Sequence, residues 1–225
     1  MKKKRKKVEW TEVRKREIKY LIGHYYRIQK HRVAMGNQVF ALNQQKNSDT
    51  PINYFHKRIF DIEKEMKKYL KNSLNGVPIW EEWLSKVKGI GEVLGCALIA
   101  FIDIKKAKHP SNIWSYFGLA PNQKRKRGEK VNYNPLAKTI AWKIADCFIK
   151  SKSPYRKIYD ERKKYEQEKH PELTKGHINM RARRYMVKRF LVDLYVKWRE
   201  LEGLPVSKPY VVDVLKHQME DMIVK

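Results

Sequence analysis

The stretch Val87-Lys88-Gly89-Ile90-Gly91 decides the fold, because two closely spaced glycines interrupt a region that is otherwise helical in pattern. Before it, residues 79–87 are expected to form a short helix whose apolar face carries Trp80, Trp83, Leu84 and Val87. After it, a second expected helix buries Val93, Leu94, Ala97, Leu98, Phe101 and Ile102. The pattern predicts two helices joined by a tight turn.

This turn has the features of a helix–hairpin–helix, which grips a nucleic-acid backbone without reading bases. Glycine lets the chain turn tightly and approach another surface. Gly91 also opens a helix, whose free N–H groups and positive dipole end suit a phosphate oxygen. The alternative is an ordinary glycine-containing turn. The candidate DNA contacts here are Lys86, Lys88, Gly89, Ile90 and Gly91.

Upstream of this region, residues 8–76 are expected to form a long helical arm. Apolar residues recur at helical spacing from Ile18 to Val33, and Thr50-Pro51 looks like an N-cap followed by proline at the first helical position. A heptad-like seam then runs through Phe55, Ile59, Ile62, Met66 and Tyr69. The arm is predicted to be an antiparallel, coiled-coil-like hairpin, packed on itself or pairing two subunits as a homodimer.

Downstream of the break at Asn75-Gly76-Val77-Pro78, the periodic segments are again helical. They include a helix that starts at Asn134-Pro135, a long basic helix from Ile178 to about Glu202, and a last helix from about Pro209 to Ile223. No strand pair is evident. The sequence therefore predicts an all-α protein with a disordered basic tail (1–7), the arm (8–76) and a helix–hairpin–helix domain (77–225).

The charge balance points to a polyanionic partner. The 225 residues contain 51 Lys or Arg against 24 Asp or Glu, a formal net charge of +27. Self-repulsion at this charge opposes compaction, and a nucleic acid would relieve it. The basic start is followed by Val8-Glu9-Trp10 where a signal peptide would be apolar, and the longest apolar run is about half the ~20 residues that span a bilayer. Cys96 and Cys147 lie in apolar helical patterns, so a reducing, intracellular setting is expected.

Two further basic clusters are candidate phosphate contacts, although each could also be a solvated surface. The first is the polar loop between Asn122 and Tyr133, which holds Lys124, Arg125, Lys126, Arg127 and Lys130. The second lies on the long basic helix, where Arg181, Arg184 and Lys188 share one face, with Arg183 and Arg189 nearby. The tail at residues 2–7 is expected to be an electrostatic arm.

Catalytic patterns are weak by comparison. Asp103, Asp146 and Asp160 are spread over separate expected helices, and each is explained as a cap or a surface charge. The seven histidines show no paired metal spacing, with His170 and His177 a poor pair. No phosphate-binding glycine loop and no Gly-x-Ser-x-Gly occurs. The expectation is a binding protein with no catalytic residues, no metal and no cofactor.

From Lys86 onward the chain resembles the C-terminal domain of the DEDD-type insertion-sequence transposases, the bridge-RNA-guided recombinases related to Piv invertases. The resemblance covers about half of the chain. Its pieces, in order, are Val87–Gly91 leading into Ala97–Ala100, then Trp114-Ser115-Tyr116-Phe117-Gly118-Leu119-Ala120-Pro121, a basic loop ending at Gly128, Leu136-Ala137-Lys138, Ser153-Pro154-Tyr155 with Tyr159, and Ala182–Val187. In that family the preceding helices form a dimerisation arm, and residues 8–74 look like a version of it.

Two departures from the family pattern bear on activity. The family's RuvC-like domain with its four acidic residues has no counterpart in this sequence. The family also has a nucleophilic serine shortly after Gly-Leu-x-Pro, whereas residues 122–128 here contain no Ser or Thr. The resemblance therefore implies a DNA-binding domain that kept the scaffold without the chemistry.

The sequence predicts a non-enzymatic protein that binds double-stranded DNA through its backbone, cytoplasmic and nucleoid-associated or encoded by a virus or plasmid. One alternative is a recombinase component that works with a partner nuclease. Another is a protein that binds structured RNA, whose wide minor groove is recognised by shape.

Overall fold

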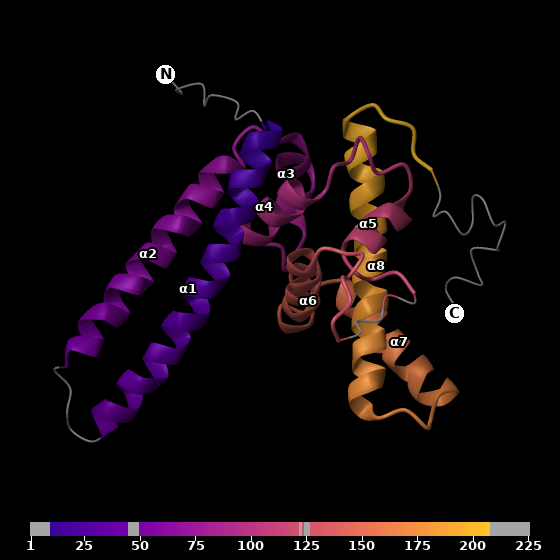
Figure 1. The fold of residues 1–225 in the computed structure, drawn as a ribbon. Coiled ribbons are helices and arrows are strands. Elements are labelled where there is room, and N and C mark those ends of the chain that lie inside the picture. Colours follow the sequence, from indigo (N-terminus) through magenta and orange to yellow (C-terminus); the bar gives the residue numbers. More distant parts are fainter. Residues whose placement is uncertain (1–9, 45–49, 122, 124–126, 208–225) are drawn as a thin grey trace.

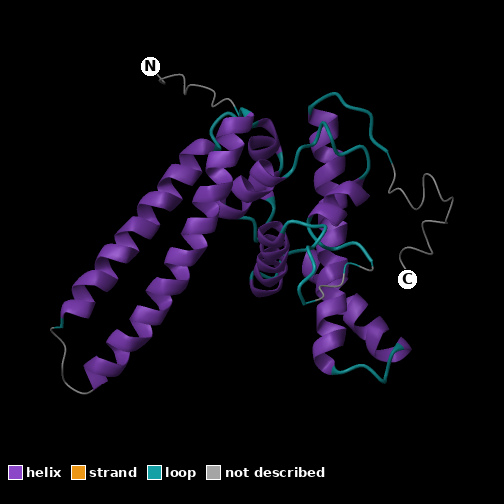
Figure 2. Cartoon of the chain, viewed as in Figure 1, coloured by secondary structure: helices purple, strands orange, loops and turns teal. Residues whose placement is uncertain are grey.

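The structure, a computed structural model, describes residues 10–44, 50–121, 123 and 127–207 (Figures 1 and 2). These residues form helices and connecting loops without any strand, which confirms the predicted all-α class. The basic tail at 1–7 and the expected helix at 209–223 lie outside the described residues. The elements are α1 (Glu12–Gln44), α2 (Pro51–Ser73), α3 (Pro78–Glu82), the 3₁₀-helix η1 (Leu84–Lys86), α4 (Glu92–Phe101), α5 (Pro110–Tyr116), α6 (Pro135–Lys150), α7 (Tyr155–Lys169) and α8 (Lys175–Leu201).

Helices α1 and α2 run side by side as an antiparallel hairpin that extends away from the rest of the molecule (Figure 1). Between them lies Glu63, which is buried; its carboxylate accepts a hydrogen bond from Gln29 Nε2 at 3.1 Å and forms an ion pair with Arg32. Burial alone would raise the pKa of Glu63, but the hydrogen bonds from Arg32 and Gln29 and the charge of Arg32 outweigh it and lower the pKa. This polar contact ties the two helices together halfway along the arm.

The predicted apolar seam of α2 lies only partly inside the hairpin. Met66 packs against the core and Ile59 is half-buried, but Phe55, Ile62 and Tyr69 are 56%, 46% and 38% exposed. Positions 63, 66, 70 and 73 also follow helical spacing. Periodicity alone therefore does not show whether these positions or the predicted seam are buried against α1. The buried line of α2 contains Glu63, Leu70 and Ser73.

The core of the protein surrounds α4, in which every residue from 93 to 101 is buried. Helices α1, α2 and α6 all pack against α4. The same core includes Ile18 and Ile22 of α1 and Leu70 of α2. The base of the arm and the helices after residue 76 thus share one packed interior at their junction; the division into separate domains at that point stays a prediction.

The expected helix over residues 79–87 is interrupted, which corrects the sequence-based boundary. Helix α3 ends at Glu82, Trp83 adopts φ −137° and ψ −58°, and η1 follows as a separate 3₁₀ turn. The Trp83 ring stacks on Phe190 of α8 with centroids 5.9 Å apart. Phe190 also meets Phe148 of α6 edge to face at 5.0 Å. The apolar spacing of residues 79–87 would continue the helix through Trp83. The chain breaks there instead, at the residue whose indole packs against α8.

The ends of two helices show how local sequence sets the loop between them. At the end of α5, Gly118 takes φ +64°, and the Leu119 N–H donates to the Trp114 carbonyl at 2.8 Å. At the start of α6, the Asn134 side chain accepts from the N–H groups of residues 136 and 137, both at 3.0 Å, and Pro135 follows. The basic loop is therefore held at both of its ends.

In the part of the chain that the structure describes, no helix has both the length and the apolar character to cross a membrane.

Candidate nucleic-acid interface

The turn between η1 and α4 is closed by a hydrogen bond from the Ile90 N–H to the Val87 carbonyl at 3.0 Å. The Ile90 side chain is 6% exposed and packs inward. Any contact of Ile90 with DNA would therefore be made by its backbone, and its place among the candidate contacts stays a prediction. Lys86 and Lys88 are exposed, and neither forms an ion pair with a described residue.

The two glycines of the hairpin have different surroundings. Gly89 takes φ +101°, and a Cβ on it would lie 2.9 Å from both Phe148 Cδ1 and Ser151 Oγ. Gly91 has an ordinary φ of −90°, and a Cβ there would meet nothing within 4 Å. The close approach that Gly89 permits is to helix α6 of the same chain, so its small size serves the fold. Gly91 is the position that leaves open space at the start of α4.

The N-terminus of α4 already has a carboxylate beside it. The Glu92 backbone N–H hydrogen bonds to its own carboxylate and is the largest cause of the lowered pKa of that group; burial opposes the shift, and Lys67 and Lys71 of α2 reinforce it. Lys71 Nζ lies 3.4 Å from Glu92 Oε1 and Lys67 Nζ 3.9 Å from Oε2. A phosphate arriving at this helix end would meet this negative charge as well as the dipole.

The basic loop is only partly within the described residues. Lys124, Arg125 and Lys126 lie outside them, whereas Arg127 and Lys130 are exposed and make no ion pair with a described residue. Gln123 ties the loop to α5, because its Nε2 donates to the Ser115 carbonyl at 3.1 Å and to Ser115 Oγ at 3.2 Å.

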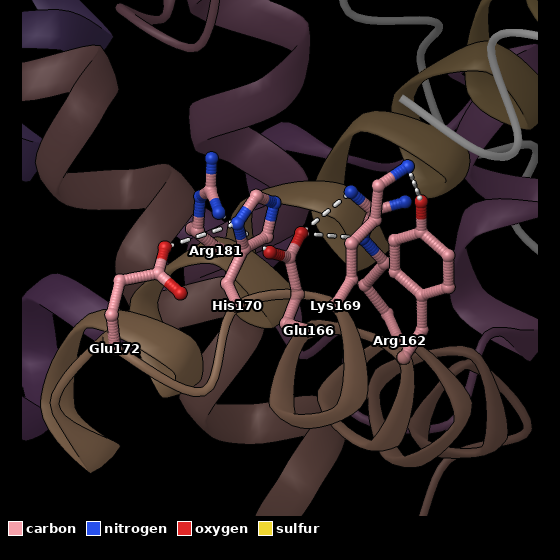
Figure 3. Close-up of polar contacts among 7 residues, drawn as sticks. Arg162, Glu166, Lys169, His170, Glu172 and Arg181 are labelled. Atoms are coloured by element: carbon pink, nitrogen blue, oxygen red, sulfur yellow. Dashed lines mark hydrogen bonds and ion pairs between the residues drawn. The ribbon is translucent and has the colours of Figure 1, made fainter.

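On the third candidate surface, α7 and α8 pair through a buried carboxylate (Figure 3). Glu166 of α7 is 1% exposed. Arg162 Nε donates to its Oε1 at 2.8 Å, and Arg181 Nη1 donates to its Oε2 at 2.8 Å. Part of the positive charge of Arg181 is therefore used inside the protein.

Arg184 and Lys188 lie on the same face of α8 as Arg181, but neither binds Glu166. Arg184 is exposed and Lys188 half-buried, and neither forms an ion pair with a described residue. The Lys188 Nζ lies 4.1 Å from the ring centroid of Trp114 on α5. Of the neighbouring candidates, Arg183 is bound to Asp146 at 2.7 Å, and Arg189 is exposed.

The three aspartates are held by neighbouring cations. Asp146 pairs with Lys150 and Arg183, and Asp160 pairs with Arg156. Asp103 accepts from the backbone N–H of residue 106 at 3.3 Å and pairs with the lysine there. They lie on separate elements, and within the described ranges no three His, Cys, Asp or Glu side chains are grouped as metal ligands. Cys96 and Cys147 are both free thiols, the first buried and the second half-buried.

Three residues near these surfaces were not found from the sequence. Trp114 and Arg162 frame the α8 cluster, and both come from other helices, so the linear pattern around residues 181–188 carried no signal for them. Lys152 is exposed, follows Ser151 next to the hairpin, and takes φ +51°. The only local signal for Lys152 was the turn-like Ser-Lys-Ser-Pro sequence.

Comparison with known proteins identifies one stretch of the chain. The search of curated proteins and the search of solved structures found no match to the chain. Residues 81–156 match the family model described as Transposase IS116/IS110/IS902 family. The match runs from the end of α3 through the hairpin, α4, α5, the basic loop and α6 to the start of α7, and it leaves out the arm and α8. The sequence from the hairpin to the first turn of α7 is therefore a transposase-related domain.

Proposed function

We propose that this protein binds double-stranded DNA through its phosphate backbone, with little dependence on base sequence and no catalytic step of its own. The observation that carries the proposal is the set of lysines and arginines without ion pairs to described residues at the hairpin, in the basic loop and on α8. Transposases act on DNA, so the matched domain supports DNA as the polyanion. The protein would then act where DNA is, at the nucleoid or as part of a virus or plasmid.

The salt dependence of binding tests this proposal. If six to eight phosphates are neutralised, log K should fall against log salt with a slope of roughly −5 to −7, because each phosphate contributes about −0.9. Two duplexes of equal length and unrelated sequence should give the same slope. A slope shallower than about −2 would contradict backbone binding. Competition by a structured RNA against the labelled duplex would show whether RNA is the preferred partner.

The absence of catalysis is proposed from the residues that follow Pro121. A covalent DNA intermediate needs a hydroxyl or similar nucleophile. Residues 122–128 supply only amide, amine and guanidinium groups before the glycine, and Ser115 is tied to Gln123. We expect no nicking, strand transfer or covalent adduct on supercoiled plasmid with Mg²⁺ or Mn²⁺. Metal-dependent relaxation that disappears in Asp103→Asn or Asp146→Asn would contradict this.

The arm supports a homodimer as the functional unit. Its two helices expose Val33, Phe40, Phe55 and Ile62, which are 48%, 65%, 56% and 46% exposed. Val33 and Phe40, and likewise Phe55 and Ile62, are seven residues apart, so each pair lies on one face of its helix, as in surfaces through which helices associate. Light scattering should give twice the chain mass for the parent and the chain mass for Phe55→Glu with Ile62→Glu. A monomeric parent would contradict the dimer and leave DNA binding untouched.

A further inference from the structure

Lys188 is a half-buried cation that has no carboxylate partner among the described residues. Its Nζ lies 4.1 Å from the centroid of the Trp114 ring. The Trp114 Nε1–H donates to the Lys188 backbone carbonyl at 3.2 Å, so the ring is fixed beside the ammonium. Withdrawing an ammonium from water without a paired anion costs free energy, which the face of an indole offsets only in part. A bound anion would complete this site.

The two charged groups that act most strongly on Lys188 are both cations, Arg184 and Arg162. Its own helix contributes Arg181 and Arg184, and α7 contributes Arg162. Glu166 is the carboxylate that binds this cluster, and Arg162 and Arg181 each donate to one of its two oxygens. Helix α5 contributes only the uncharged Trp114. Glu166 therefore binds two of these four cations, Arg162 and Arg181, whereas Arg184 and Lys188 have no ion pair with a described residue.

We propose that Lys188 and Arg184 together hold one phosphate group of the bound nucleic acid, and that Lys188 takes a proton from solvent when the phosphate binds. This inference rests on the proposed DNA binding and assigns it a site and a pH dependence. The two side chains are one helical turn apart on α8, the spacing at which neighbouring side chains can reach a common ligand. The Trp114 ring covers one side of the Lys188 ammonium, and the side chain is only half-buried, so part of it remains accessible to a ligand.

The proton linkage follows from the environment of the free site. Burial, followed by the charges of Arg184 and Arg162, lowers the pKa of Lys188 to about 8. A phosphate beside the ammonium adds an opposite charge and raises that pKa again. Between the two pKa values the complex holds a proton that the free protein lacks, so affinity falls as pH rises. From pH 7 to pH 9 the fall should approach about tenfold, because about one-tenth of a group with a pKa near 8 stays protonated at pH 9.

The experiment measures the affinity for a labelled DNA duplex at constant ionic strength from pH 6.5 to 9.5, by fluorescence anisotropy. Four proteins are compared: the parent, Lys188→Arg, Lys188→Met and Lys88→Met, each checked for folding by circular dichroism. Lys88→Met is the matched control, because it removes an exposed lysine that lies at the hairpin, away from Lys188 and Trp114. Lys188→Arg keeps the charge at every pH, since a guanidinium does not titrate there.

We expect the parent to lose about tenfold in affinity between pH 7 and 9. Lys188→Arg should keep the affinity at pH 9 and show a smaller pH dependence, and Lys188→Met should be weak at both pH values. Lys88→Met should be weaker than the parent with the parent's pH dependence. A parent that binds DNA with the same pH dependence as Lys188→Arg would overturn this inference alone. A parent that binds no DNA at any pH would overturn the proposed function and the inference with it.

Discussion

Replacing Gly89 by alanine should destabilise the protein, although Gly89 lies in a short turn between two exposed positions, Lys88 and Gly91. A left-handed backbone costs a non-glycine residue about 1–2 kcal/mol. The new Cβ would also lie 2.9 Å from Phe148 and Ser151, and overpacking of this kind costs about 1–3 kcal/mol. The sum of about 2–5 kcal/mol should lower Tm by roughly 5–20 °C in a chain of this size. Thermal unfolding followed by circular dichroism measures this directly, and an unchanged Tm would refute the packing argument.

Gly91 provides the matched comparison at the same hairpin. It is the N-cap of α4 without a capping side chain, so Gly91→Ser and Gly91→Asp should both keep or slightly raise Tm. The aspartate adds a negative charge where the phosphate is proposed to approach, so Gly91→Asp should bind DNA several-fold more weakly than Gly91→Ser. Equal affinities for these two variants would show that the start of α4 does not contact DNA.

Three further predictions concern other charged or polar groups. Glu92→Gln should strengthen DNA binding a few-fold at low salt, because it removes the carboxylate at the start of α4, whereas Glu82→Gln, an exposed control, should change affinity less. The lowered pKa of Glu63 contributes stability that is present above its ordinary value near 4.5 and is lost as pH falls through the lowered pKa, so Tm of the parent should drop more steeply below pH 4.5 than Tm of Glu63→Gln. Asn134→Ala should cost about 1 kcal/mol, or roughly 2–4 °C in Tm, because two N–H groups of α6 lose their acceptor; a neutral result would contradict the capping role.

Local pattern predicted most of the helices, because helix periodicity and caps are properties of neighbouring residues. The start of α6 at Asn134-Pro135 and the buried stripe of α8 are examples. The break at Trp83 was missed because it coincides with a contact that the local sequence does not show, the stacking of Trp83 on Phe190, more than a hundred residues away. The seam of α2 was only partly placed: Met66 packs against the core, but Glu63 and Leu70 are buried where Ile62 and Tyr69 were expected, and the sequence does not show that Glu63 pairs with Arg32 inside the hairpin.

The candidate site was predicted as a set of basic positions, without their individual roles. Gly89 and Gly91 look equivalent in the sequence, and only the packing of α6 separates the one that serves the fold from the one that is open. Arg181 and Lys188 likewise look equivalent on α8. The first is bound by Glu166 of α7, and the second lies against Trp114 of α5. Such distinctions arise from contacts between helices, which spacing along one helix does not encode.

The shared core at the base of the arm has a mechanical consequence. With 33 residues, α1 is about 50 Å long, and its first half is embedded through Ile18 and Ile22 in the interior that holds α4. The second half of α1 therefore extends from a fixed base, and the angle between the arm and the helices around α4 can change only if the core at that base repacks. In a pair of molecules joined along their arms, a force on either tip would therefore act on the packing around α4.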